Sequence, residues 1–144
     1  MFVQIAIGSS LLLISLMIGA IGFWLLESLL IRRRHWLARP PHRPKLILLL
    51  CLSGVGVLAQ LTVSAWLWAL TFSVLGIFAT FEEALYFALV VFTTLGFGDI
   101  LLPVEWRLLA GMASVNGLLF IGLVSAVMVE AMRQVRLMQQ RGLS

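Results

Sequence analysis

The sequence predicts an all-α membrane protein with three transmembrane helices and one shorter, re-entrant helix. Of its 144 residues, 62% are hydrophobic and only 11% are charged, which is more apolar surface than a soluble chain of this size can bury. The charges leave three uncharged stretches, 1–26, 46–81 and 108–129, each long enough to cross the ~30 Å hydrocarbon layer. A fourth uncharged stretch, 84–98, is too short to cross and ends in two closely spaced glycines, which is typical of a re-entrant loop.

The first predicted unit, 1–45, consists of a transmembrane helix over about 3–31 and a basic loop. Its uncharged start, its long apolar run and the arginines that follow indicate a membrane anchor rather than a cleavable signal peptide. The prolines between Pro40 and Pro44 prevent this helix from continuing into the next. The sequence leaves open whether the first helix packs against its own chain or against a neighbouring copy.

The basic residues predict how the chain is oriented. With three crossings, nine of the ten Lys and Arg fall on one side, and only Arg107 falls on the other. The positive-inside rule makes the basic side cytoplasmic, so in the plasma (inner) membrane the N-terminus is expected outside and the C-terminus inside. The loop arginines Arg32, Arg33 and Arg34 either serve as this orientation signal alone or also bind anionic lipid.

The second predicted unit, 46–144, contains three helices and one special loop. We expect an outer helix at 46–72, a short helix at 81–93, the loop at 94–99 and an inner helix at 106–136. The short helix begins at Thr80, and Glu83 three residues later completes a capping box. Trp66 and Trp68, near the end of the outer helix, are aromatic residues of the kind found at membrane interfaces.

The loop after the short helix carries the most informative motif, Thr-Thr-Leu-Gly-Phe-Gly-Asp at 93–99. Glycine reaches backbone conformations that are closed to other residues. With Gly96 and Gly98 alternating with larger residues, the chain can turn successive carbonyls to one side instead of alternating them as a strand does. The C-terminus of the short helix adds partial negative charge beside this loop. The pattern therefore predicts a cation site built from backbone carbonyls.

Residues 80–130 resemble the pore module of potassium channels, in the form Thr-x-Gly-(Tyr/Phe)-Gly-Asp at 94–99. Pro103, the Trp-Arg-Leu-Leu at 106–109 and the Asn-Gly at 116–117 are similar to small bacterial single-pore channels grouped with the two-pore-domain ion channels. The resemblance implies a homotetramer that conducts K+ passively, because one filter segment per chain requires four chains. It implies no cofactor and no enzymatic activity. The K+ ligands, which replace the ion's water shell, would be Thr94, Leu95, Gly96, Phe97 and Gly98.

The same resemblance assigns residues that support the filter and form its outer mouth. They are Thr93, Tyr86 and Asp99. Val90 stands where some bacterial channels have a glutamate that pairs with the aspartate after the filter, so we expect Asp99 to accept a hydrogen bond from Tyr86 instead. Phe97 replaces the commoner tyrosine and, together with Leu95, is expected to pack behind the filter.

The inner helix is expected, by the same resemblance, to form the cavity and gate below the filter. The residues assigned to it are Asn116, Gly117, Leu118, Ile121, Ser125 and Val129. Gly117 is either a hinge or a site of tight helix packing. Asn116 lies at membrane depth and needs a polar partner, which is the back of the filter, a neighbouring helix or cavity water. Glu130 and Arg133 are expected to pair between subunits.

Two other functions remain open from the sequence. One is a non-selective or Na+-conducting channel of the same architecture, and the other is a membrane-embedded assembly subunit that does not conduct. No helix carries an arginine at every third position, so the sequence indicates no voltage sensor of that kind. The gating stimulus is not indicated.

Overall fold

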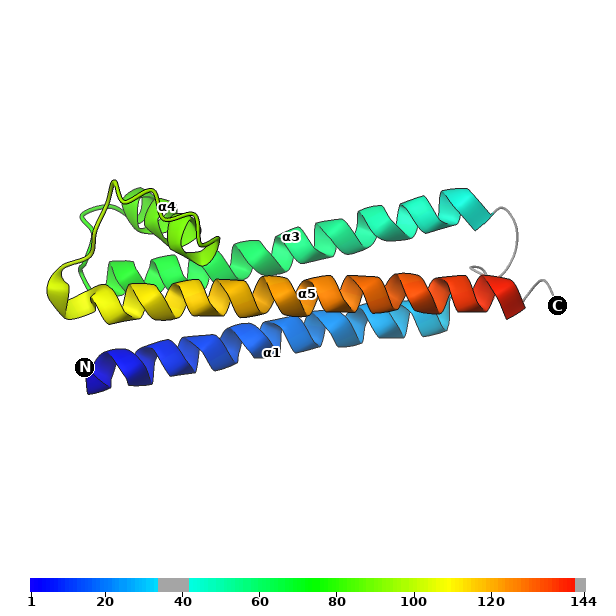
Figure 1. Ribbon diagram of the computed structural model, residues 1–144, viewed down its shortest axis with the longest axis horizontal. Coiled ribbons are helices and arrows are strands. Elements are labelled where there is room, and N and C mark those ends of the chain that lie inside the picture. The colour runs from blue at the N-terminus through cyan, green and yellow to red at the C-terminus, as the bar shows by residue number, and fades with distance from the viewer. Residues whose placement is uncertain (34–41, 142–144) are drawn as a thin grey trace.

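The computed structural model describes residues 1–33 and 42–141, and these residues form helices joined by loops (Figure 1). The elements are α1 (Phe2–Arg32), α3 (His42–Val74), α4 (Phe81–Phe92), the short 3-10 helix η1 (Val104–Trp106) and α5 (Arg107–Arg141). The three long helices lie side by side, with α1 and α5 running in one direction and α3 in the other. The short α4 packs against α3 and α5 at the end of the bundle that holds the N-terminus.

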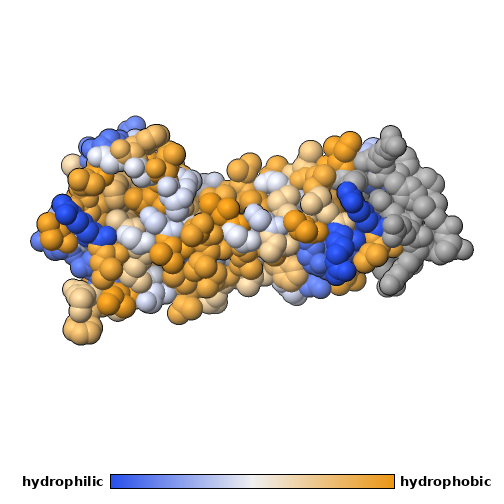
Figure 2. Space-filling model, viewed as in Figure 1, coloured by the Kyte–Doolittle hydropathy of each residue, from blue (hydrophilic) through white to orange (hydrophobic). Residues whose placement is uncertain are grey.

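The three long helices are each long and apolar enough to cross a membrane. They contain 31, 33 and 35 residues, which is well above the roughly 20 that a crossing needs. Apolar side chains cover the middle of the visible surface, and hydrophilic ones gather toward the two ends (Figure 2). This distribution matches a hydrocarbon layer between two polar phases, so the chain is a membrane protein.

The helix boundaries differ from the sequence prediction at a few ends. The second long helix, α3, begins at His42 and ends at Val74, so it is longer at both ends than the predicted 46–72. Pro44 is its third residue, a position where the missing N–H has no intrahelical partner to lose. The last helix continues to Arg141 instead of ending near 136. Most of the basic loop, including Arg34, lies outside the described residues.

The larger apolar core joins α3, α4 and α5. Phe72 of α3 packs edge-to-face on Phe87 of α4 with ring centroids 5.5 Å apart, and Phe92 of α4 lies 6.1 Å from Phe120 of α5. Such aromatic pairs stabilise a core beyond their buried area. Trp68 is fully buried in this core, beside Phe72, instead of lying at a membrane interface as predicted. The core therefore fixes α4 against both of the long helices that flank it in sequence.

The first helix packs along α5 of its own chain, which answers the question that the sequence left open. Small residues allow the close approach: a Cβ added to Gly8 would lie 2.5 Å from Sδ of Met112, and one added to Gly19 would lie 3.2 Å from Leu123. Near the N-terminus of α1, Oε1 of Gln4 accepts a hydrogen bond from the backbone N–H of Leu109 at 3.3 Å.

Candidate functional site

The short helix α4 begins and ends as its sequence dictates. At its start, the Thr80 hydroxyl accepts a hydrogen bond from the backbone N–H of Glu83 at 3.2 Å. This is one half of the predicted capping box; among the described residues no return bond from the Thr80 backbone N–H to the Glu83 carboxylate is present. At its other end, Thr93 caps the helix and its hydroxyl donates to the carbonyl of Leu89 at 2.7 Å. The helix is thus 12 residues long.

The chain after α4 turns back onto the end of that helix before it extends. The N–H of Thr94 donates to the carbonyl of Val91, and the N–H groups of Leu95 and Gly96 both donate to the carbonyl of Val90, at distances of 3.0 to 3.3 Å. The N–H groups of Thr94, Leu95 and Gly96 therefore pair with carbonyls at the C-terminus of α4. Within the described residues, no backbone carbonyl from 94 to 99 accepts a hydrogen bond.

Every second residue of the segment has a positive φ angle. The values are 59° at Thr94, 57° at Gly96 and 76° at Gly98. The positive φ at Gly96 and Gly98 is the conformation predicted for the two glycines, and its alternation with ordinary conformations allows successive carbonyls to turn toward one side of the chain. Thr94 was not predicted to adopt this conformation, which costs a non-glycine residue about 1–2 kcal/mol. The one feature of the sequence that could have indicated this conformation is the spacing of the glycines. Gly96 and Gly98 are two residues apart, and Thr94 lies two residues before Gly96.

The segment is open to its surroundings in the single chain. All residues from 93 to 99 are exposed, including two large apolar side chains, Leu95 at 57% and Phe97 at 64%. They were predicted to pack behind the segment, but no packing from the described part of the same chain covers them. Exposed apolar side chains of this size mark a contact surface for another molecule.

The predicted hydrogen bond between Tyr86 and Asp99 is present. The Tyr86 hydroxyl donates to Oδ2 of Asp99 at 2.6 Å, the short distance typical of a bond to a charged carboxylate. This contact lowers the pKa of Asp99, while the carboxylate raises the pKa of the Tyr86 hydroxyl. The bond ties the middle of α4 to the far end of the 94–99 segment. It replaces the carboxylate pair that Val90 rules out.

Replacing Tyr86 with phenylalanine is expected to loosen the C-terminal end of the 94–99 segment. The change keeps the aromatic ring and removes only the hydroxyl that bonds to Asp99. We expect the backbone amides of 97–100 to exchange with solvent several-fold faster in Y86F at neutral pH. Thr71→Val is a matched control, because it removes a hydroxyl that bonds only to its own helix, at Leu67. Unchanged exchange in Y86F would show that the bond does not order the segment.

The bond between Tyr86 and Asp99 makes the difference in amide exchange between Y86F and the wild type depend on pH. The Asp99 contribution is present above the ordinary pKa of a carboxyl group and is lost as the pH falls through the lowered pKa of Asp99. The Tyr86 contribution is present below the ordinary tyrosine pKa and is lost as the pH rises through its raised pKa. Neutral pH lies between these limits, so Y86F and the wild type are expected to differ there and to converge in acid.

Gly117 of α5 lies directly under the C-terminus of α4. A Cβ added there would overlap the carbonyl oxygen of Phe92 and lie 2.6 and 2.9 Å from the carbonyl carbon and Cα of that residue. These are backbone atoms, so they cannot move aside as a flexible side chain does. The tight-packing interpretation of Gly117 therefore has a direct structural basis. At Gly122, by contrast, an added Cβ meets nothing within 4 Å.

The structure corrects the prediction that Asn116 faces a cavity. Its side chain is fully buried, and Nδ2 donates a hydrogen bond to the Ser15 hydroxyl of α1 at 2.9 Å. Of the alternatives considered, the neighbouring helix is thus the partner, and that helix is α1. The other polar side-chain atom of Asn116, Oδ1, has no hydrogen-bond partner among the described residues. Asn116 points away from the exposed side of α5 because α1 covers that part of the helix surface.

The other predicted cavity residues lie together on the uncovered side of α5. Leu118 is 63% exposed and Val129 is 61% exposed, and Ile121 and Ser125 between them are exposed as well. The Ser125 hydroxyl donates to the carbonyl of Ile121 within the helix at 2.8 Å. We call these four residues the exposed stripe of α5. No other helix of the described chain covers them.

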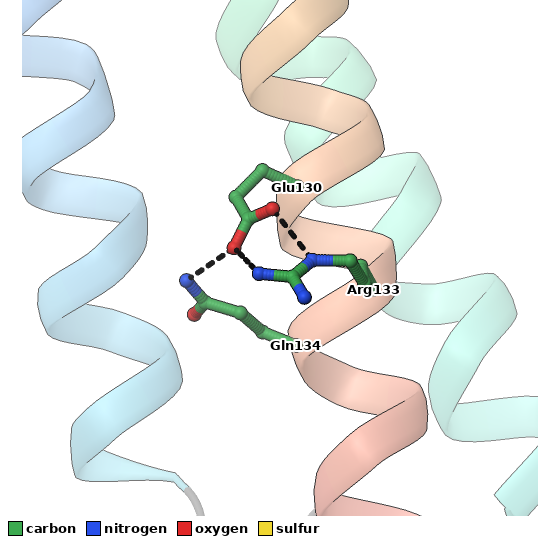
Figure 3. A network of polar contacts seen from close by, with 3 residues as sticks. All are labelled: Glu130, Arg133 and Gln134. Carbon is green, nitrogen blue, oxygen red and sulfur yellow. Dashed lines mark hydrogen bonds and ion pairs between the residues drawn. The ribbon is translucent and has the colours of Figure 1, made fainter.

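The C-terminal part of α5 carries a small polar network (Figure 3). Nε of Arg133 donates to Oε2 of Glu130 at 2.8 Å, and Nε2 of Gln134 donates to Oε1 of the same carboxylate at 3.2 Å. Glu130 and Arg133 therefore pair within one helix of the described chain, and the expected pairing between subunits stays a prediction. Both side chains are accessible to solvent, so the pair adds little to stability. Arg32 and Arg33 are also exposed at this end of the bundle.

The comparison with protein families gives a match to the ion channel family over residues 47–134. That range includes α4, the 94–99 segment and most of α3 and α5, and it leaves out α1. Searches among curated proteins and among solved structures found no match. The matched range covers more than half of the chain and all of the geometry described above except the contacts of α1. The chain belongs to the ion channel family.

Proposed function

We propose that the chain is one subunit of a homotetrameric, potassium-selective channel in which Thr94–Gly98 line the ion path. The observation that carries this proposal is the alternation of positive φ angles at Thr94, Gly96 and Gly98 in a segment whose carbonyls accept no hydrogen bond from the described chain. Carbonyl oxygens turned to one side can replace the water shell of a dehydrated K+ ion. The Thr94 hydroxyl adds a further oxygen at the inner end. The proposal includes no enzymatic activity and no cofactor, since K+ is the permeant ion.

The geometry of a single chain supports assembly from several copies, and the resemblance to known pore modules sets their number at four. One segment supplies oxygens on one side of an ion only, and complete coordination needs several segments around an axis. The exposed Leu95 and Phe97 support this assembly, because a neighbouring subunit would cover them. The exposed stripe of α5 supports it as well, since a cavity or a neighbouring subunit would occupy that side.

Charges at the outer mouth favour cations. Glu82, Glu83, Asp99 and Glu105 oppose Arg107 alone, which leaves a net charge of minus three per chain at this end. All five side chains are exposed. In a tetramer they would concentrate cations near the entrance, within a screening length of about 8 Å at physiological salt. The dipole of α4 adds partial negative charge where its C-terminus meets Thr93.

The orientation in the membrane is also part of the proposal. The ends of α1 and α5 and the start of α3 lie at one end of the bundle (Figure 1), and nine of the ten Lys and Arg belong to these regions or to the loop and tail beside them. By the positive-inside rule this end faces the cytoplasm of a cell bounded by its plasma membrane. The N-terminus and the outer mouth would then lie outside.

Ion flux through the purified protein in liposomes tests the proposed function. With KCl inside and NaCl outside, we expect K+ efflux that Ba2+ blocks and a reversal potential that follows the K+ gradient. A reversal potential near zero in opposing K+ and Na+ gradients would favour a non-selective channel. Flux no greater than that of empty liposomes, from protein that is tetrameric by crosslinking, would favour a non-conducting assembly subunit.

A further inference from the structure

We propose that a groove between α1, α3 and α5 binds one acyl chain of an anionic phospholipid. The groove has a volume of about 480 Å³ and is lined almost entirely by apolar side chains. Small residues line it, namely Gly19 and Gly22 on α1 and Ser53, Gly56 and Ala59 on α3, and of these glycines Gly56 is the one with open space at its Cβ position. This site lies outside the 94–99 segment and does not depend on conduction.

The groove exists because the three long helices touch at two levels and leave space between them. At the outer level, the core around Trp68 and Phe120 joins them. At the inner level, a second cluster joins Leu30 of α1, Leu49 of α3 and Val135 of α5. Between these clusters, a Cβ added to Gly56 would meet nothing within 4 Å, although Gly56 is part of the groove wall.

The position of the groove identifies lipid as its occupant. Its walls belong to the segments that are long and apolar enough to cross a membrane, so lipid chains are the molecules that surround it. On α5, the wall residues Leu123 and Val127 lie about 140° and 180° around the helix from Leu118 of the exposed stripe, at about 100° per residue. The groove therefore opens on the side of α5 that faces away from the exposed stripe.

The charge near its inner end favours an anionic headgroup. The groove extends from Ile18 to Leu29 along α1, a distance of about 17 Å at 1.5 Å per residue. Arg32 and Arg33 lie three and four residues after Leu29, about one helical turn farther along, and are exposed. Each basic residue near the membrane surface strengthens attraction to anionic lipid. A headgroup held there would let its acyl chain extend along the groove toward Gly22.

Two polar side chains lie in the groove wall, and one of them, Ser53, donates its hydroxyl hydrogen bond to carbonyls of its own helix. The amide of Gln60 packs directly on Gly22, and no hydrogen-bond partner for it is present among the described residues. It lies at the end of the groove that is farther from Arg32. An acyl chain that stops short of Gln60 leaves room there for water, which satisfies the amide better than hydrocarbon does.

Native mass spectrometry of the purified chain tests the site with palmitoyl-oleoyl phosphatidylglycerol as the probe. The test variant is Gly56→Leu, which fills the groove, and the matched control is Gly54→Leu. Gly54 is on the same helix, has equal space around it and lies outside the groove. We expect G56L to retain the lipid about tenfold more weakly than G54L or the wild type, which corresponds to displacing about two methylenes.

Two further measurements test the headgroup preference and the identity of the molecule in the groove. The Arg32→Gln/Arg33→Gln variant is expected to lose the preference for phosphatidylglycerol over phosphatidylcholine while still retaining lipid. A photoreactive residue at Val57, in the groove wall, is expected to form adducts of lipid mass in membranes. Equal lipid retention by G56L and G54L, or photoadducts to a second copy of the chain, would overturn the proposal. Because none of these measurements records flux, they decide the site even if the protein does not conduct.

Discussion

Gly96→Ala is expected to abolish K+ flux while leaving the assembly intact. Gly96 has a φ of 57°, a conformation that an alanine adopts only at a cost of about 1–2 kcal/mol. An added Cβ meets nothing within 4 Å, so the variant introduces no steric clash that would prevent folding. The strain is relieved if φ becomes negative, and that change turns the neighbouring carbonyl out of line with those of Thr94 and Gly98. We expect flux to fall at least about a hundredfold in the liposome assay.

Gly76→Ala is the matched control for this prediction. Gly76 also has a positive φ, 67°, and also has open space at its Cβ position, but it lies in the connection between α3 and α4. Its substitution introduces the same backbone strain without touching the 94–99 segment. We expect G76A to lose a comparable amount of stability and to keep its flux. Normal flux in G96A would argue against carbonyl coordination by this segment, and equal loss in both variants would show that strain alone is responsible.

Gly117→Ala is expected to displace α4 from α5 and to destabilise the fold. The added methyl overlaps the backbone carbonyl of Phe92, and that overlap is relieved only if the end of the helix moves. Overpacking of this kind costs about 1–3 kcal/mol. Because Phe92 directly precedes Thr93 and the carbonyl segment, we also expect flux to fall strongly. Thermal unfolding of the purified protein measures the first effect, and liposome flux measures the second.

Gly122→Ala separates the packing role of Gly117 from a general effect of glycine in α5. An added Cβ at Gly122 meets nothing, and alanine is the better helix former by about 1 kcal/mol, so G122A is expected to be as stable as the wild type or more so. If G117A instead kept wild-type stability and changed only the open probability of single channels, Gly117 would act as a hinge and the packing interpretation would fail.

The local features of the site were predictable because short stretches of sequence determine them. Thr80 starts α4 because its hydroxyl caps an unpaired N–H, whatever the rest of the chain does. Gly96 and Gly98 adopt positive φ because glycine, which has no Cβ, is the one residue type that reaches this conformation without a steric cost. The bond from Tyr86 to Asp99 was expected from the resemblance to known pore modules, since composition and spacing do not indicate it.

Features that join distant parts of the chain were not predictable in this way. Asn116 bonds to Ser15, 101 residues away in sequence, and nothing in the pattern around either residue selects that pair. Trp68 looked like an interfacial residue by its place near the end of a span, but its partners in the core are on other helices. The positive φ at Thr94 is imposed by the bonds of the following residues to Val90, which draw the chain back over the end of α4.

The sequence by itself determined that this chain is an all-helical membrane protein, with three spans set by where charges are absent and a carbonyl segment set by two glycines. These properties depend on hydration and on local backbone sterics, which act over a few residues at a time. Only the tertiary structure decided that α1 packs on α5, that the C-terminus of α4 packs against Gly117, and that a groove remains between α1, α3 and α5. Those outcomes depend on which surfaces fit together, and complementary shape is a property of the folded helices and not of any one segment.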